Sequence, residues 1–304
     1  MTDPLQTLDW LLDADPAIRW QAMRDLTDAS PDDIAKERAR VAHEGWGARL
    51  LGLQGEDGNW GGGAYSPKWI STTYTLLLLR HLGVDPEDER VRTAIGRVRE
   101  KVRMGRMDLP FFEYVGETCI SGMALALNSY FREADGARID WFLEEQKSDG
   151  GWNCDVGSTR SSFNTTISVL EGLLEYERSV NGDRAVSDAR RRAHEFLLER
   201  RLMYRLSDGE LINKRWLLLS FPPRWFYDVL RALDYLSGAG TEPDERCSDA
   251  IEVIRRKQRK DGTWPLQGRH AGKEHFTMEQ PGKPSRWNTL RALRVLDWYG
   301  MAPQ

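Results

Sequence analysis

The sequence contains few cysteines and no long apolar segment, and each absence argues against a class of protein. Its 304 residues include only three cysteines, Cys119, Cys154 and Cys247, which lie far apart along the chain. This odd number favours a reducing compartment over a disulfide framework. The N-terminus, MTDPLQTLDW, lacks the basic start and apolar core of a signal peptide, and apolar runs such as Thr75 to Leu79 are too short to span a membrane. The sequence therefore predicts a cytoplasmic protein without a transmembrane segment and leaves peripheral contact with a membrane open.

Neither sign of charge dominates the composition. The chain carries 43 basic and 47 acidic residues, a formal net charge of -4, and this gives no reason to expect a nucleic-acid partner. The sequence also lacks the alternating apolar pattern of half-buried strands, and helical periodicity dominates instead. The 12 tryptophans are many for this length, which indicates a need for large, flat side chains.

Three seven-residue segments of the chain are nearly the same. Gln54 to Trp60 reads QGEDGNW, Gln146 to Trp152 reads QKSDGGW, and Gln258 to Trp264 reads QRKDGTW. The shared pattern is Q-x-x-D-G-x-W, and each copy follows a helical stretch and precedes a polar loop. The three copies indicate a chain built by repetition.

Two kinds of helix alternate along the chain, one charged with a single apolar stripe and one apolar on most sides. The charged helices are expected at Leu5–Asp13, Ile34–Leu53, Glu89–Arg103, Ala137–Gln146, Ala189–Arg201 and Asp249–Gln258. The apolar helices are expected at Ile18–Leu26, Trp69–Leu82, Glu117–Phe131, Asn164–Tyr176, Trp225–Leu236 and Trp287–Tyr299. Strict alternation of outer and inner helices predicts an all-α, α6/α6 toroid with parallel inner helices. An open solenoid of hairpins remains the alternative.

No linker or low-complexity tract divides the chain, so we expect residues 1–304 to form a single toroid domain. Three connections, at residues 180–187, 202–223 and 265–284, are long for a compact domain. Loops of this length are often functional.

The Q-x-x-D-G-x-W pattern resembles the QW motif of triterpene cyclases of the squalene-hopene type and of protein prenyltransferase β-subunits. The resemblance implies an α/α toroid in which the Gln and Trp of each motif tie outer helices together and the Asp-Gly pair makes the turn. It also implies terpenoid cyclisation or prenyl transfer on an isoprenoid substrate. This chain has the length of one toroid, whereas the cyclases are roughly twice as long.

The catalytic signatures of that family are mostly missing. The cyclases' D-x-D-D acid motif is absent, and Gly116-Glu117-Thr118-Cys119 is its nearest positional counterpart. The prenyltransferases hold zinc with an Asp, a Cys and a His, of which only the adjacent Cys154 and Asp155 are matched. We therefore expect no cofactor and no metal, and leave open a zinc site near Cys154, Asp155, His270 or His275.

A cation beside a tryptophan marks four of the expected inner-helix starts. These pairs are Arg19-Trp20, Lys68-Trp69, Arg224-Trp225 and Arg286-Trp287. Because parallel helices gather their N-termini at one mouth, with unpaired N–H groups and partial positive charge, that mouth favours an anion. The pattern predicts a mouth that binds a phosphate, diphosphate or carboxylate above an apolar lumen. Alternatively, each Trp packs between helices and each cation pairs locally.

Acidic residues near the same mouth are the candidate catalysts. Glu117 and Asp228 are expected in the lumen, where an apolar environment would raise the pKa of a carboxyl group and make it a proton donor. Asp155, in a loop just upstream of an inner helix, is a candidate for the same mouth, and a solvated loop carboxylate is the alternative. The alternative for Asp228 is an ion pair with Arg224 on the same helical face.

Further residues are expected to contact the substrate. Asn164 and Thr165 begin an inner helix and are expected to face the lumen, although N-capping is the simpler role for neighbouring serines. Aromatic faces in a lumen stabilise carbocations. The candidates for this role are Trp69, Tyr74, Trp225, Tyr227 and Trp287, and packing between helices is the alternative for each.

Three functions follow from these observations. The first is a metal-independent enzyme of the terpenoid-cyclase or prenyl-transfer type, acting on an isoprenoid or other apolar small molecule with an anionic end. The second is a non-catalytic toroid that binds a lipid or an anionic metabolite. The third is a polysaccharide lyase or glycosidase, which rests on fold analogy alone. The sequence does not indicate an oligomeric state.

Overall fold

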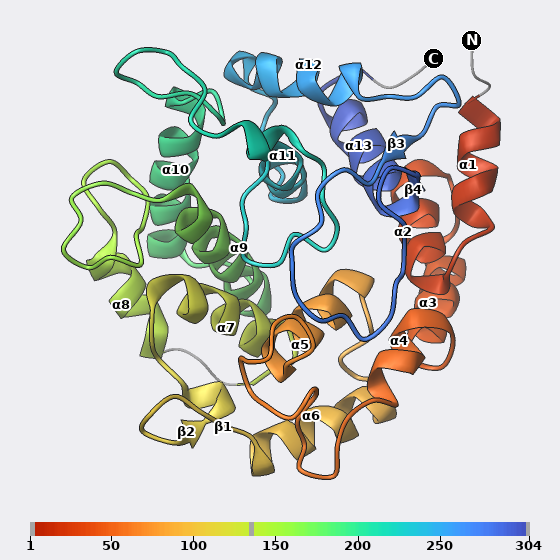
Figure 1. Ribbon diagram of the computed structural model, residues 1–304, viewed down its shortest axis with the longest axis vertical. Helices are drawn as coiled ribbons and strands as arrows, with labels where there is room; N and C mark the ends of the chain where they lie inside the picture. The colour runs from red at the N-terminus through yellow and green to blue at the C-terminus, as the bar shows by residue number, and fades with distance from the viewer. Residues whose placement is uncertain (1–3, 134–136, 302–304) are drawn as a thin grey trace.

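The computed structural model describes residues 4–133 and 137–301, which form a ring of helices in two layers (Figure 1). The outer helices are α1 (Pro4–Leu12), α4 (Gly45–Leu51), α6 (Glu89–Lys101), α8 (Ala137–Glu145), α10 (Arg184–Glu199) and α12 (Ser248–Arg256). The inner helices are α2 (Pro16–Leu26), α5 (Thr72–Leu82), α7 (Thr118–Tyr130), α9 (Phe163–Ser179), α11 (Val229–Gly238) and α13 (Arg286–Trp298). The alternation of outer and inner helices confirms the predicted all-α toroid.

Shorter elements connect these helices. An extra helix, α3 (Pro31–Ala39), lies between α2 and α4. The 3-10 turns are η1 (Arg40–Ala42), η2 (Phe111–Glu113), η3 (Lys214–Leu217) and η4 (Glu245–Cys247). Two small antiparallel pairs complete the described chain, β1 (Arg103–Met104) with β2 (Leu109–Pro110), and β3 (Trp264–Pro265) with β4 (Pro284–Ser285).

The expected continuous outer helix over residues 34–53 is wrong, because α3 ends at Ala39 and, after the 3-10 turn η1, α4 begins at Gly45. Gly45 has a φ of +62°, and a Cβ there would lie 2.1 Å from the Asp15 Oδ2 atom. The Asp15 carboxylate accepts hydrogen bonds from Ala17 N at 2.9 Å and from Trp46 N at 2.8 Å, so it caps α2 and binds the start of α4. A left-handed glycine is therefore needed where the two helices share one cap.

The ring closes where the last helix meets the first two. Arg294 of α13 forms an ion pair with Asp25 of α2 at 2.6 Å. Arg286 Nε donates to the Trp10 carbonyl oxygen of α1 at 3.1 Å, and its guanidinium lies 4.6 Å from the Trp10 ring centroid. Contacts between elements this far apart in sequence exclude the open solenoid.

The three repeated motifs join three of the outer helices, α4, α8 and α12, to the inner helix that follows each of them. The indole nitrogens of Trp60, Trp152 and Trp264 donate to the carbonyl oxygens of Leu50, Phe142 and Ile254, at 2.7, 2.8 and 2.8 Å. Their backbone N–H groups donate to threonine hydroxyls near the start of the next inner helix, those of Thr72, Thr166 and Thr289. All three tryptophans are fully buried, so the motifs act as structural wedges.

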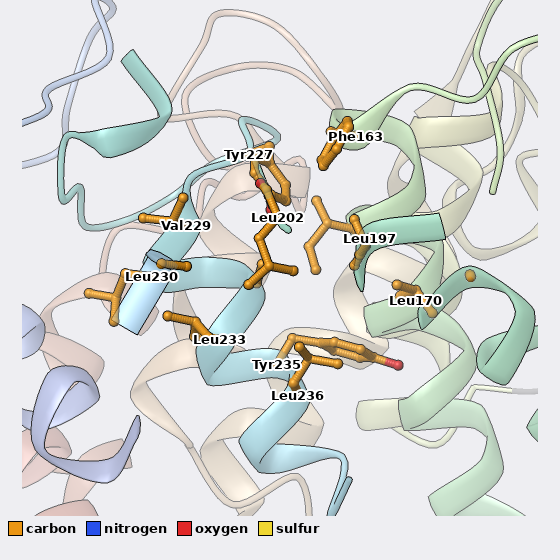
Figure 2. Close-up of a cluster of buried hydrophobic side chains, with 14 of the residues drawn as sticks. Phe163, Leu170, Leu197, Leu202, Tyr227, Val229, Leu230, Leu233, Tyr235 and Leu236 are labelled. Carbon is orange, nitrogen blue, oxygen red and sulfur yellow. The ribbon is translucent and has the colours of Figure 1, made fainter. Parts of the chain in front are cut away.

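The apolar core fills the space between the layers. Figure 2 shows part of it, where Leu170 of α9, Leu197 of α10 and Leu233 of α11 pack together. Helices α7 and α9 approach closely because both carry glycine at the crossing: a Cβ on Gly172 would lie 2.5 Å from the Gly122 carbonyl oxygen. Among the described residues, no helix is long and apolar enough to cross a membrane.

Candidate functional site in the ring cavity

The ring has two faces, which differ in access. We call the end where the inner helices begin the N-face, and the end where they stop the C-face. A cavity of about 970 Å³ opens towards the C-face. Every inner helix contributes to its lining, with Trp20, His81, Tyr130, Glu171, Asp234 and Trp298 as examples from successive helices. Its volume lies in the upper part of the range of about 300–1,000 Å³ that is usual for small-molecule sites.

Ion pairs between inner helices run around the wall of this cavity. Arg80 of α5 contacts Glu175 of α9 at 3.2 Å, Arg231 of α11 contacts Glu171 of α9 at 2.8 Å, and Arg291 of α13 contacts Asp234 of α11 at 3.1 Å. Arg294 contacts both Asp234, at 2.9 Å, and Asp25. We call these eight residues the ion-pair belt. The expected apolar lumen is therefore wrong.

The belt fixes the charge of the titratable groups that it surrounds. Burial by itself would raise the pKa of Glu171, but the paired guanidinium of Arg231, helped by Arg80, lowers that pKa to about 2. Burial and the neighbouring cation Arg80 lower the pKa of His81 to about 3. The cavity thus presents an ionised carboxylate and a neutral imidazole at neutral pH.

Aromatic rings form the deepest part of the cavity. Phe221, from the loop before α11, stacks on Trp287 of α13 with ring centroids 4.2 Å apart and an interplanar angle of 12°. Two buried donors in this region, Trp287 Nε1 and Arg80 Nε, have no hydrogen-bond partner within the described residues. A buried donor without a partner is costly, and a ligand acceptor in the cavity would satisfy it.

The N-face, where the sequence places the substrate site, is covered by a loop. Residues 266–283 cross it, and Trp69 N donates to the Lys273 carbonyl oxygen at 2.8 Å while Lys273 N donates to the Lys68 carbonyl oxygen at 2.9 Å. The Trp69 indole donates to the Ala271 carbonyl oxygen at 2.9 Å. The pocket that remains there, lined in part by Trp69 and Arg224, has a volume of about 30 Å³, little more than a water molecule.

The expected inner-helix starts at Trp69 and Trp225 are wrong, because α5 begins at Thr72 and α11 at Val229. The cations beside these tryptophans nevertheless contact aromatic rings of the N-face. The Lys68 ammonium lies 5.2 to 5.7 Å from the ring centroids of Tyr65, Trp69 and Trp225. Arg224 lies 5.5 Å from the Trp69 ring centroid and 3.9 Å from Glu274, and its burial lowers its pKa to about 10.

Asp228, expected in the lumen, lies outside the lining of the large cavity. The alternative, an ion pair with Arg224 on one helical face, is also wrong, because α11 begins only at Val229. Its carboxylate is the N-cap of α11: it accepts hydrogen bonds from Arg231 N and from Ser220 Oγ, both at 2.8 Å. Burial raises its pKa. Because both partners are local and the group is 2 % exposed, the geometry gives Asp228 a capping role.

Tyr227 and Asn164 hold two inner helices together beneath the loop. Tyr227 is buried against Phe163 (Figure 2), and its hydroxyl donates to the Leu202 carbonyl oxygen at 2.6 Å. Tyr227 N donates to Asn164 Oδ1 at 2.7 Å. Both residues lie outside the lining of the large cavity.

The remaining expected site residues divide between the two faces. Glu117 and Asp155 are exposed at the N-face, and Asp155 Oδ1 accepts a hydrogen bond from Gly157 N at 3.1 Å. Thr165 is buried and donates to Cys154 Sγ at 3.3 Å. Arg286 binds α1, as described above, and Trp287 lines the cavity. Of the residues singled out from the sequence, two tryptophans, Trp20 and Trp287, line the large cavity.

Sequence reasoning missed the ion-pair belt, although a signal for it was present. Glu171 and Glu175 of α9 stand four residues apart, and Arg291 and Arg294 of α13 stand three apart. Such spacing puts both members of each pair on one face of a helix. Charged residues on a single face of an inner helix indicate that this face lines a polar cavity.

Comparisons with known proteins show similarity at the level of solved structures alone. No protein-family model matches the chain, and no curated protein matches it. Among solved structures, the chain is similar to an apo variant of the type II terpene cyclase MstE from Scytonema, with 15% sequence identity over 96% of each chain and a TM-score of 0.45. At this level the similarity carries no argument about activity.

Proposed function

We propose that the protein is an enzyme of the terpenoid-cyclase or prenyl-transfer type, and that its substrate binds in the ring cavity. The substrate would be an isoprenoid or other apolar molecule with an anionic end. The observation that carries this proposal is the composition of the cavity, in which an aromatic floor of Phe221 and Trp287 lies beneath the ion-pair belt. An apolar chain would contact the floor, and an anionic group would contact the arginines.

The charge state of the cavity favours one version of this chemistry. A reaction that begins by protonating an alkene needs a neutral carboxylic acid beside the substrate. Glu171 has a pKa of about 2, and the pKa of Asp25 is also lowered, because Arg24 and Arg294 outweigh its burial. Both acids are therefore ionised at neutral pH. Arginines binding a diphosphate leaving group agree better with this lining.

Calorimetry with a matched set of ligands tests this proposal. We expect wild-type protein to bind farnesyl diphosphate at least about tenfold more tightly than farnesol or pyrophosphate, because only the whole molecule contacts both floor and belt. Arg80→Gln removes a cation with an unpartnered Nε while leaving Glu175 paired with Arg178. This variant should lose about tenfold or more in affinity for farnesyl diphosphate.

Lys68→Met is the control variant, because it removes an N-face cation that the sequence would have assigned to the site. It should bind farnesyl diphosphate like the wild type. Equal affinities of the wild type for farnesol and farnesyl diphosphate would contradict the assignment of the substrate site to the ring cavity. So would a loss of affinity in Lys68→Met with none in Arg80→Gln. Product analysis by gas chromatography separates an enzyme from a non-catalytic binding toroid, which would bind without turnover.

A carbohydrate substrate is the second candidate, because Asp25, Glu171, Glu175 and Asp234 line the same cavity together with aromatic rings. Glycoside hydrolysis requires one protonated and one ionised carboxyl group. The arginines hold Glu171 and Asp25 in their ionised form, which places this function second. Cleavage of an oligosaccharide with no binding of farnesyl diphosphate would reverse that order.

A further inference from the structure

Three potential metal ligands gather at the N-face, on the other side of the ring from the cavity opening. Glu117 and Cys119 lie at the start of α7, and Cys154 lies in the loop that follows the second repeated motif. Their carboxylate and sulfur atoms all lie within 4.8 Å of one another. Across residues 4–133 and 137–301, this is the one group of three such ligands found.

The two elements that carry these ligands are fixed in place. Trp152, two residues before Cys154, is fully buried as a motif wedge, and Thr118, beside Cys119, is 2 % exposed. Cys154 Sγ accepts hydrogen bonds from Cys119 N at 3.2 Å and from Thr165 Oγ1 at 3.3 Å. Two donors aimed at one sulfur atom suit a thiolate, and both cysteines are free of disulfide bonds.

We propose that Glu117, Cys119 and Cys154 form a binding site for a thiophilic divalent metal ion of the Zn²⁺ class, separate from the ring cavity. Thiolate and carboxylate are both established zinc ligands, and thiolates select zinc over magnesium or calcium. Three protein ligands leave the fourth tetrahedral position to water. Two sulfurs on one zinc ion lie about 3.8 Å apart, so side-chain movements of about 1 Å suffice to close the site.

The surroundings give the ion a path into the site. Glu117 is exposed and Cys154 is half-buried, so solvent reaches the ligands from the N-face. The third cysteine, Cys247, provides a contrast: it is fully buried in another part of the ring, and burial raises its pKa to about 12. Cys247 is therefore the matched control, a thiol of the same chain outside the cluster.

Metal titration of the reduced full-length protein tests this proposal. The protein is stripped with a chelator, kept reduced with a phosphine, and titrated with Co²⁺ and then Zn²⁺. We expect a sulfur-to-cobalt charge-transfer band in the wild type that disappears when Zn²⁺ displaces Co²⁺. Cys119→Ser and Cys154→Ser should each lose the band and weaken Zn²⁺ binding by about 100-fold or more. Cys247→Ser should keep both the charge-transfer band and the wild-type affinity for Zn²⁺.

Glu117→Gln keeps the proposal falsifiable if a cysteine variant fails to fold, because Glu117 is exposed and its side chain caps nothing. It should keep the charge-transfer band and weaken Zn²⁺ binding by about tenfold. Absence of the band in the wild type overturns the proposal. So does Zn²⁺ affinity that is unchanged in Cys119→Ser and Cys154→Ser, since the ion would then bind elsewhere.

Discussion

The N-face and the C-face of the ring are held together by different interactions. At the N-face, buried indoles bridge outer and inner helices, and the loop of residues 266–283 packs over Trp69. At the C-face, the ion-pair belt joins α2, α5, α9, α11 and α13 around open space. Apolar packing leaves no room for a ligand, whereas paired charges tolerate water and a polar ligand. The binding site is therefore expected at the face that packing does not fill.

Removing a motif tryptophan should reduce the free energy of unfolding more than any other change considered, and it alters packing at the N-face alone. Trp152→Ala deletes a fully buried indole and its 2.8 Å hydrogen bond to Phe142, so we expect a loss of about 4 kcal/mol in the free energy of unfolding. Urea unfolding followed by circular dichroism measures it. Trp152→Phe retains most of the volume and should lose about half as much. A loss under about 1 kcal/mol in Trp152→Ala would refute the wedge role.

Breaking the belt should have the next largest effect. Glu171→Gln leaves the nearly buried guanidinium of Arg231 without its carboxylate partner, and we expect a loss of about 3 kcal/mol in the free energy of unfolding. The same unfolding measurement applies. Glu252→Gln is the control, because Glu252 forms its ion pairs with Arg255 and Arg256 on the exposed side of α12. It should leave the free energy of unfolding nearly unchanged, because solvent screens these exposed pairs. Equal losses of unfolding free energy in Glu171→Gln and Glu252→Gln would show that a buried ion pair of the belt stabilises the protein no more than an exposed pair does.

The ring could be predicted from sequence because its signals are local. Helical periodicity and a seven-residue motif are read over short windows, and each copy of the motif joins neighbouring elements. The helix ends were harder to predict, because caps decide them: Asp228 ends the loop before α11, and Gly45 breaks the second outer segment. Both depend on partners, Ser220 and Asp15, that only the folded chain identifies.

The candidate site could not be predicted in the same way, because it depends on the course of a long loop. The sequence places four cations near helix starts, and the charge of those helix ends favours an anion there. Nothing in the sequence near Lys68 and Trp69 indicates that residues 266–283, about 200 positions later, cover them. The belt is equally non-local, since Glu171 and Arg231 are 60 residues apart.

Acid should weaken the protein in part through His81 in the cavity. Burial and Arg80 hold the pKa of His81 at about 3, below the ordinary value of 6.5. Between these values the unfolded chain binds a proton that the folded chain does not, so stability falls as the pH drops below 6.5. The wild type should therefore lose unfolding free energy between pH 6.5 and pH 5, and in His81→Gln this loss should be smaller by up to about 1.5 kcal/mol. Urea unfolding at several pH values measures this, and superimposable profiles would contradict it.

The smallest effect on stability should distinguish the first repeated motif from the third. Gln54 Nε2 donates to the carbonyl oxygens of Gly58, in its own turn, at 3.0 Å and of Ala94, in α6, at 2.9 Å. Within the described chain, Gln258 Nε2 makes one such bond, to Gly262 at 3.3 Å. Gln54→Ala should therefore cost about 1 to 1.5 kcal/mol of unfolding free energy, and Gln258→Ala about 0.5 kcal/mol. Thermal unfolding of both variants measures the difference. An equal or larger loss in Gln258→Ala would contradict this prediction. It would mean that each motif glutamine stabilises the protein only through the bond within its own turn, and that the bond from Gln54 to Ala94 of the next outer helix adds nothing.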